Sequence, residues 1–569
     1  MTKHAPNDRL SWLGSEYFRH TYAEDPFAAT AFGIPGHEAE VPDPSRDGDR
    51  RRLEALDGLL QKFGALDPAA LDDQDRVTYT MLGRLLRGER DEMAAGFGRG
   101  AFEVGVSGSV AGVPSQVFAT VPTTARLRGE ADADAYLRRL RGLGGYFEAL
   151  SRRYRQAAAE GRVPPAHGVR QAAEQLRAYL ASDPAGDLFL RPATDDRQRE
   201  RILTVVRDVV RPALARHAAA LTGEILPRAR SDGHVGLCHV PGGEAAYQVA
   251  AQVHTTTDLT PEEIHGIGLD HLGALRAEFA ETGSRALGTS DVTAVLRRLR
   301  ADPALRFEDA GQILDSATTS LRRAEAAMRD WFRDYALAPC VVEATHPAEA
   351  EGSTLAYYRP PAADGSRPGA HVVNTHEPRS RPRFEYEALA FHESLPGHHL
   401  QIALAQSRDD LPDFQRFAFL TAHGEGWGLY VERLADEMGL YTSDLDRLGM
   451  LSFDAWRACR LVVDTGMHHL GWSRTRAIEF LRANSALSES NIRNEVDRYI
   501  AWPGQALAYL IGRLRIEQLR HLAERRLGSG FSVKDFHHHV LAHGAVPLDT
   551  LDDIIRRWIE RGWTERPGG

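Results

Sequence analysis

Apolar residues recur along most of the chain at spacings of three to four positions. The spacing is clear at Leu137, Leu140, Leu143 and Phe147. It places such residues on one face of a helix. Ala, Leu, Arg and Glu, which favour helices, dominate the same stretches. The pattern therefore predicts a mainly α protein.

Local signals mark where two of these helices begin. The segment Thr260–Glu263 has Thr as the N-cap, Pro in the first helical position and Glu three residues after the Thr. Together these residues form a capping box. Ser473 precedes the helix-forming run Ala477–Leu481 and predicts a second start.

One short region has the composition of β-strands. The runs Cys340–Ala344, Thr354–Tyr358 and Ala370–Asn374 are rich in β-forming residues, with Asp364 and Gly365 in the loop between the last two. A small sheet at residues 340–374 is therefore expected. An exposed edge of this sheet could bind an extended peptide as an added strand. Alternatively, the sheet only shapes the fold.

The length of the chain predicts more than one structural unit. Its 569 residues exceed the roughly 250–300 at which a single hydrophobic core stops growing. Turn-forming residues cluster at 41–48, 182–186 and 283–291, and no repeat of fixed period is found. We therefore expect two or more subdomains.

Composition narrows the possible partners. Hydrophobic residues make up 43% and charged residues 26% of the chain, as in globular proteins, and the net charge of -10 does not suit a phosphate backbone. The first residues lack an apolar segment of signal-peptide length, and no later run approaches the roughly 18 apolar residues that span a bilayer. We therefore expect a cytoplasmic protein that binds neither nucleic acid nor membrane.

The three cysteines indicate thiols. Cys238, Cys340 and Cys459 lie far apart and form no CxxC pair. Buried thiols are therefore a better interpretation than a disulfide or a thiolate zinc site.

The segment His392–His399 resembles a zinc-binding HExxH helix but departs from it at one position. In that motif two His residues four positions apart share a helix face, and the Glu acts on the metal-bound water. Here Pro396 occupies the position of the second His. Pro396 and Gly397 favour a bulged or unwound helix, which would bring His398 round as the second ligand, with His399 as the alternative.

A third ligand is available downstream. Glu425 is flanked by glycines, and with two imidazoles it would complete a His2Glu set that leaves one zinc position open for water. Glu432 is seven residues further on and on roughly the same helix face. It could orient a ligand His, or be a solvated surface carboxylate.

Six segments together resemble one bacterial family. They are His392–Gln401, Gly424–Glu432, Arg460–His468, Arg498–Gly512, Phe536–Leu548 and Thr255–His265. In this order they resemble the domain-of-unknown-function family 885, which is similar to the gluzincin zinc peptidases. The resemblance implies a two-lobed, mainly helical metallopeptidase-like fold with a cleft. On this basis we expect one peptidase-like unit over 1–569, with a mainly helical N-terminal lobe at 1–285 and a catalytic lobe at 286–569 that contains the sheet, the metal helix and the C-terminal helices. The resemblance does not specify a substrate. It also implies Zn²⁺ bound by His392, His398 and Glu425, with Glu393 as general base.

An amide hydrolase also needs a donor for the developing oxyanion. Tyr499, Tyr509 and His468 are candidates, because phenol and imidazole groups can donate such a hydrogen bond. If the stretch is helical, Asp464 could orient His468 from four residues away. The run His537–His539 projects in different directions from a helix and is interpreted as structural or surface-exposed.

These residues lead to a functional hypothesis with two alternatives. We expect zinc-dependent hydrolysis of amide bonds in short peptides or peptide-like small molecules. The alternatives are a dedicated amidase or carboxypeptidase that trims one biosynthetic intermediate, and a catalytically inactive helical binding protein. Four arginines could clamp a substrate carboxylate, although solvated or paired arginines are commoner: Arg493, Arg498, Arg513 and Arg520.

Overall fold

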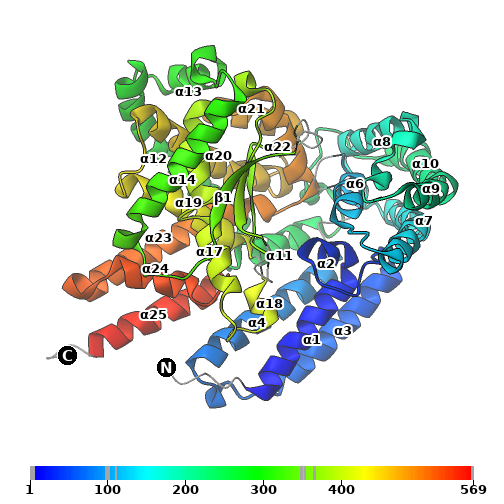
Figure 1. The fold of residues 1–569 in the computed structure, drawn as a ribbon, viewed down its shortest axis with the longest axis horizontal. Helices are drawn as coiled ribbons and strands as arrows, with labels where there is room; N and C mark the ends of the chain where they lie inside the picture. The colour runs from blue at the N-terminus through cyan, green and yellow to red at the C-terminus, as the bar shows by residue number, and fades with distance from the viewer. Residues whose placement is uncertain are drawn as a thin grey trace.

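A computed structural model confirms the mainly α fold with a small sheet (Figure 1). It describes residues 7–564 except 97–102, 109–111, 347–349, 351–353, 363–366 and 419. The N-terminal helices are α1 (Asp8–Glu24), α2 (Pro26–Phe32), α3 (Arg46–Gly64) and α4 (Asp73–Ala94). They are followed by α6 (Val113–Thr124), α7 (Glu130–Ala159), α8 (Ala166–Ala181), α9 (Asp196–Val205) and α10 (Arg211–Ala220).

The remaining helices flank the sheet on both sides in the sequence. Those before it are α11 (Gly243–Thr255), α12 (Pro261–Leu287), α13 (Val292–Ala301) and α14 (Ala310–Trp331). Those directly after it are α16 (Tyr386–Glu393), α17 (His398–Gln406), α18 (Asp413–Arg416), α19 (Thr421–Glu437), α20 (Asp444–His468) and α21 (Arg474–Asn484). The last are α22 (Glu489–Ala501), α23 (Ala508–Leu527), α24 (Val533–Leu541) and α25 (Leu548–Thr564).

The sequence signals for helices are confirmed at the level of side chains. Leu140 and Leu143 of α7 are fully buried. At the start of α12 the Glu263 backbone N–H donates to Thr260 Oγ1, and the Thr260 N–H donates to the Glu263 carboxylate. Ser473 caps α21 by accepting from the backbone N–H of Arg476. These three helices therefore form as their sequences predict.

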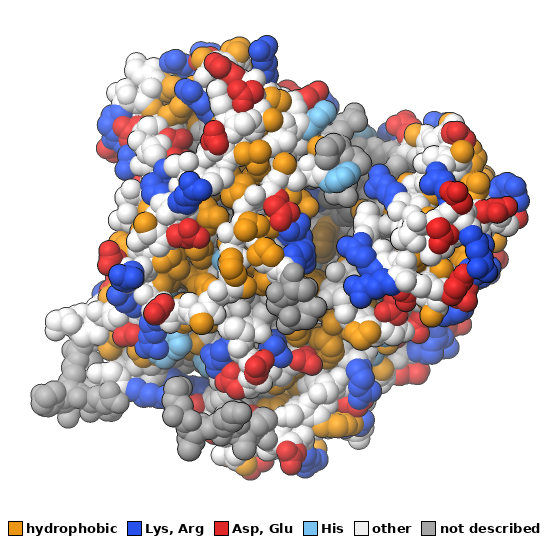
Figure 2. Space-filling view, in the orientation of Figure 1, with side chains coloured by type: hydrophobic (Ala, Val, Ile, Leu, Met, Phe, Trp, Pro, Cys, Tyr) orange, Lys and Arg blue, Asp and Glu red, His pale blue; other side chains and the backbone are white. Residues whose placement is uncertain are grey.

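Two hydrophobic cores divide the described residues. The smaller is built mainly by α6–α10 and includes Phe27 of α2; the larger takes in α1, α3, α4 and the elements from α11 to α25. Helices α6–α10 gather at one side of the molecule, and the surface is hollowed between them and the larger part (Figures 1 and 2). The division differs from the expected boundary at residue 285, because α1, α3, α4, α11 and α12 share the larger core with the helices that follow that residue.

The sheet lies close to the predicted runs. Strands β1 (Cys340–Ala344), β2 (Ala356–Arg359) and β3 (Gly369–Val373) are arranged in the order β1-β3-β2. Strand β3 pairs in parallel with β1 and antiparallel with β2. In this order β1 and β2 are the edge strands of the described sheet. The predicted turn at Asp364 and Gly365 lies outside the described residues.

Two further expectations concern cysteines and membrane spans. All three cysteines are free thiols, and Cys459 is fully buried whereas Cys238 and Cys340 are partly exposed. None of the helices in the described part of the chain is both long enough and apolar enough to cross a bilayer.

Candidate metal centre

The helix that carries His392 unwinds where the sequence predicts. Helix α16 ends at Glu393, Ser394 has non-helical dihedrals (φ -106°, ψ -119°), and α17 begins at His398. A Cβ atom at Gly397 would lie 1.9 Å from the His392 carbonyl oxygen, so only glycine fits there. The indole N–H of Trp427 donates to the Pro396 carbonyl at 3.0 Å and holds the unwound segment against α19.

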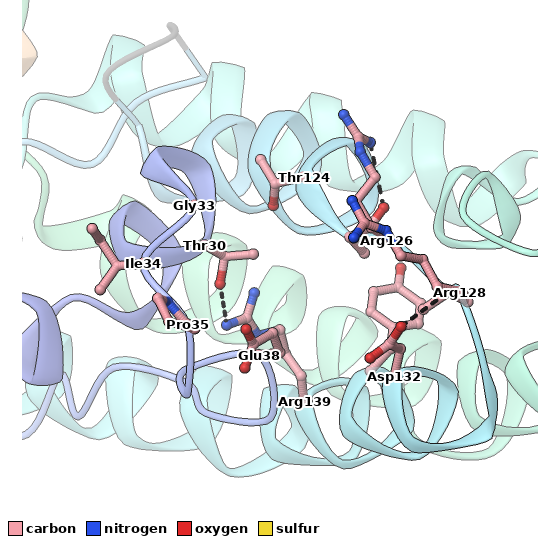
Figure 3. A pocket seen from close by; sticks show the side chains of 13 residues that line it. Thr30, Gly33, Ile34, Pro35, Glu38, Thr124, Arg126, Arg128, Asp132 and Arg139 are labelled. Carbon is pink, nitrogen blue, oxygen red and sulfur yellow. Dashed lines mark hydrogen bonds between the residues drawn. The ribbon is translucent and has the colours of Figure 1, made fainter. Parts of the chain in front are cut away.

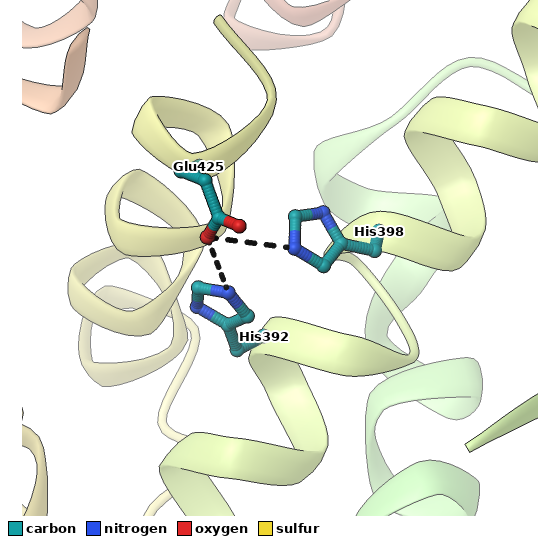
Figure 4. Close-up of side chains that lie close together, drawn as sticks. All are labelled: His392, His398 and Glu425. Carbon is teal, nitrogen blue, oxygen red and sulfur yellow. Dashed lines mark ion pairs between the residues drawn. The ribbon is translucent and has the colours of Figure 1, made fainter. Parts of the chain in front are cut away.

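This break brings three ligand groups together. His392 at the end of α16, His398 at the start of α17 and Glu425 of α19 each place one ligand atom within 4.8 Å of the others (Figure 4). Glu425 Oε2 lies 3.3 Å from His392 Nε2 and 3.8 Å from His398 Nε2. Among the described residues this is the one group of His, Cys, Asp and Glu side chains with such spacing.

Glu432 orients the His392 ring. Its Oε1 accepts from His392 Nδ1 at 2.8 Å, and the Glu432 side chain is only 2% exposed. The surface interpretation of Glu432 is therefore wrong. A proton held on Nδ1 by Glu432 leaves Nε2, on the side of Glu425, as the nitrogen available to a metal, which is the arrangement that metal-binding histidines use.

The charges of the cluster are strongly coupled. Burial opposes a charge on His392, but hydrogen bonds to Glu425 and Glu432 outweigh it and raise the pKa of His392 to about 10. Burial also opposes the charge on Glu425, yet both imidazoles hold the pKa of that carboxyl well below its usual range. The site therefore favours an ionised Glu425 beside a protonated imidazole. A bound metal cation would replace the proton of that imidazole.

Glu393 faces the same pocket from the end of α16. Burial raises the pKa of Glu393, while the charges of His392 and His398 and the backbone of Tyr358 in β2 oppose that rise. A carboxylate whose pKa lies above its usual range is suited to accept and return a proton near neutral pH.

His399 is held elsewhere. Its Nδ1 accepts from the Tyr358 hydroxyl at 3.0 Å, and its Nε2 donates to the Ala338 carbonyl at 2.9 Å. Because both ring nitrogens are engaged with the sheet and the segment before it, His398 is the residue that joins the cluster.

The three candidate oxyanion donors lie in different surroundings. Tyr509 lines the pocket beside the cluster, with the Arg460 guanidinium 4.2 Å from its ring centre. The Tyr499 hydroxyl donates to Glu495 and accepts from Arg460 and Trp456. Of the two tyrosines, only Tyr509 is among the described residues that line the pocket.

His468 is a structural residue, contrary to expectation. Its Nδ1 accepts from the backbone N–H of Leu237 and its Nε2 donates to the Tyr499 carbonyl, so no ring nitrogen is left for substrate. Burial lowers its pKa to about 3. Asp464 does not orient this ring, because its Oδ1 accepts from the Tyr247 hydroxyl and the Gly504 backbone N–H.

The other predicted side chains are separate from the cluster. Both ring nitrogens of His537 are hydrogen-bonded, to the Trp331 carbonyl and the Tyr430 hydroxyl, which agrees with a structural role. Of the four arginines considered as clamps, three are paired with carboxylates: Arg498 with Glu495, Arg513 with Asp454, and Arg520 with Glu437. Arg493 is exposed on α22.

The pocket around the cluster has a volume of about 500 Å³, within the usual range for small-molecule sites. Its polar wall includes the cluster, Glu393 and Tyr509. Two arginines of α20, Arg457 and Arg460, also line it, and neither was predicted as a site residue. Their spacing of three residues places both on one helix face, which was the available signal.

A second pocket lies between α2, α6 and α7 (Figure 3). Its volume is about 360 Å³, and the buried Arg139 lies in its wall. That guanidinium donates to the Glu40, Pro26 and His37 carbonyls and to Thr30 Oγ1. These hydrogen bonds connect α7 to α2 and to the segment that follows α2.

The sequence profile of one bacterial family of proteins of unknown function, DUF885, matches residues 26–555. The chain belongs to this family. The matched range extends over the cluster residues, Glu393 and Tyr509. A comparison with curated proteins finds no match.

Solved structures share the fold of this DUF885 protein. One is a protein from Colwellia psychrerythraea, provisionally named a lipoprotein, with a TM-score of 0.89 and 26% identity over 97% of this chain and 99% of the other. Another, from Shewanella oneidensis and of unknown function, carries the same provisional name. It aligns with a TM-score of 0.76 and 16% identity over 96% and 99% of the two chains.

Proposed function

We propose that the protein is a zinc-dependent hydrolase of amide bonds in short peptides or peptide-like small molecules, as in gluzincin peptidases. The observation that carries this proposal is the convergence of His392, His398 and Glu425 in a pocket that also holds Glu393. Two imidazoles and a carboxylate form a common ligand set of catalytic zinc.

The cluster fits zinc in its spacing and its chemistry. Donor atoms about 2.0–2.2 Å from one tetrahedral ion lie roughly 3.3–3.6 Å apart. The two distances from Glu425 to the imidazoles, 3.3 and 3.8 Å, are close to that range. The hydrogen bond from His392 to Glu432 is the support that such ligands typically receive.

When bound, Zn²⁺ would supply Lewis acidity toward a water molecule and an amide carbonyl. Glu393 takes one proton from the water molecule while the water oxygen forms the new bond to the carbonyl carbon. Tyr509 donates a hydrogen bond to the carbonyl oxygen as negative charge develops there. The C–N bond then breaks, and Glu393 passes its proton to the leaving amine nitrogen.

The pocket favours small substrates. Its volume of about 500 Å³ accommodates a few residues and excludes a folded protein. Tyr357 and Tyr358 of the edge strand β2 line it, so the earlier hypothesis of an extended peptide beside this strand is retained. A dedicated amidase or carboxypeptidase for one biosynthetic intermediate would use the same site.

The cytoplasmic location also stays a prediction. The two related structures are provisionally named lipoproteins, and lipoproteins are attached to membranes. Fractionation of cells that express the full chain would distinguish a cytoplasmic from a membrane-associated location.

The proposal is tested on the purified full chain with a library of short peptides. We expect zinc and peptide hydrolysis in the unchanged protein, zinc without hydrolysis in Glu393→Gln, and neither in His398→Ala. Glu479→Gln, the same change at an exposed position of α21, should behave as the unchanged protein. Full hydrolysis by Glu393→Gln would contradict the proposal, and bound zinc without any turnover would favour the inactive binding protein.

A further inference from the structure

Arg457 is a buried cation that forms no ion pair with a carboxylate in the part of the chain that the structure describes. Its side chain belongs to α20 and lines the pocket of the metal cluster, and the residue is only 6% exposed. Its Nε and Nη1 atoms are buried and have no hydrogen-bond partner among the described residues. Burial of a charge is costly unless an opposite charge or hydrogen bonds compensate for it. An anion bound beside Arg457 would therefore offset the cost of burying its charge.

Aromatic rings fix the orientation of this guanidinium. Its central carbon lies 4.2 Å from the ring centre of Trp456 and 4.7 Å from that of Phe453. Such stacking is typical of arginines and uses none of their N–H hydrogen-bond donors. The side chain is thus held in place before any ligand arrives.

The carboxylates of the metal cluster do not neutralise Arg457. The charges of Glu432 and Glu425 act on Arg457 and partly offset the effect of burial on its pKa. Both carboxylates are already engaged, however: Glu432 with His392, and Glu425 with both imidazoles. A cation bound at Glu425 would reduce that negative charge further.

Arg460, one turn along the same helix, differs from Arg457. Its Nη2 donates to Glu495 and its Nε to the Tyr499 hydroxyl, while its buried Nη1 has no partner among the described residues. Arg460 is therefore a paired cation that can offer one additional N–H, and Arg457 is the unpaired one.

We propose that Arg457 binds the C-terminal carboxylate of the substrate, so that the enzyme acts on peptides or N-acyl amino acids at their free-acid end. This proposal rests on amide hydrolysis at the cluster of His392, His398 and Glu425. A guanidinium binds a carboxylate through two parallel hydrogen bonds. Because Arg457 and the cluster line one pocket of about 500 Å³, the carboxylate and the scissile amide belong to a small molecule. Hydrolysis then releases the C-terminal amino acid as the amine product.

Apolar residues complete the subsite. Ile402, Phe417 and Ala418 line the same pocket, and Phe32 of α2, which is 61% exposed, lies at its rim. A C-terminal residue with an apolar side chain therefore suits this surface better than a charged one.

The first test is binding, which does not depend on turnover. Calorimetry on the zinc-loaded full chain compares 3-phenylpropanoate with 3-phenylpropanamide, which differ only in the carboxylate. We expect the acid to bind about tenfold or more tightly, and Arg457→Gln to remove this preference. Arg525→Gln, the same charge change at an exposed position of α23, should retain it. An undiminished preference in Arg457→Gln would show that another group binds the carboxylate and would overturn the proposal.

The second test is hydrolysis of matched N-acyl dipeptides that end in a free acid or an amide. We expect kcat/KM to favour the acid by roughly 10- to 100-fold, and Arg457→Gln to bring the ratio close to one. If Arg457→Gln does not fold, the acid-to-amide ratio of the unchanged protein and the weaker ratio expected for Arg457→Lys carry the test. Equal cleavage of acid and amide would overturn this proposal and leave amide hydrolysis standing. Loss of the binding preference in Arg457→Gln without turnover of any peptide would support the carboxylate site and contradict the proposed hydrolysis.

Discussion

Replacement of Gly428 by alanine tests whether the close approach of α19 to His392 positions the metal ligand. A Cβ atom at this position would lie 2.4 Å from Cε1 and 2.7 Å from Nε2 of His392. Carbon atoms in contact prefer about 3.5–4.0 Å, so the ring has to move by about 1 Å. The ring is held by Glu432 at 2.8 Å and lies 3.3 Å from Glu425. A movement of this size breaks at least one of these contacts.

The expected cost falls on metal binding. Loss of a group that orients a metal-binding histidine typically weakens affinity about 10- to 100-fold, which corresponds to about 1.4–2.7 kcal/mol. Alanine is the better helix former by about 1 kcal/mol, which offsets part of the strain in α19. We therefore expect Gly428→Ala to remain folded and to bind zinc about 10- to 100-fold more weakly.

The assay is competition for zinc with a chromogenic chelator, together with thermal unfolding followed by circular dichroism. Gly273→Ala is the matched control, because Gly273 is exposed within α12 and an added Cβ there meets no atom within 4 Å. The control should bind zinc as the unchanged protein does and unfold at the same or a higher temperature. Zinc affinity of Gly428→Ala within about twofold of the control would refute the reasoning.

Three further predictions test neighbouring parts of the account. His399→Gln should retain zinc and lose about 1–2 kcal/mol of stability from its two hydrogen bonds, whereas His398→Ala should lose zinc; metal analysis and urea unfolding measure both. Tyr509→Phe should lower kcat for peptide hydrolysis about 100- to 1,000-fold with little change in KM, and an unchanged kcat would exclude Tyr509 as the oxyanion donor. Burial lowers the pKa of His217 from 6.5 to about 4. As the pH falls from about 6.5 to 4, this imidazole is therefore protonated in the unfolded chain but stays neutral in the folded protein. The free energy of unfolding should therefore decrease by up to roughly 3 kcal/mol between about pH 6.5 and 4. In urea unfolding, the free energy of unfolding of His217→Gln should decrease less over this pH range. An equal decrease would show that His217 is not the source of the pH dependence.

The sequence predicts those features of the fold that local chemistry decides. The capping box at Thr260, the cap at Ser473 and strand β1 at Cys340–Ala344 depend on neighbouring residues and are confirmed. The boundary between the two cores depends on which helices pack together. Helix α12 lies against α20, nearly 200 residues later, and no local signal near residue 285 encodes that contact.

The candidate site shows the same distinction. Pro396 and Gly397 predict the unwound segment that brings His398 beside His392, because proline and glycine act on the backbone locally. The roles of His468 and Asp464 depend on Leu237 and Tyr247, more than 200 residues away, so their spacing on α20 was misleading. Arg457 was missed because arginines are mostly exposed, and its burial follows from tertiary packing.

The most direct test of the central claim is anomalous scattering at the zinc absorption edge from a crystal of the full chain purified with zinc. The account predicts one peak about 2.0–2.2 Å from a nitrogen of His392, a nitrogen of His398 and an oxygen of Glu425. A zinc peak at His399 or at the run His537–His539, or no peak within this pocket, would contradict it.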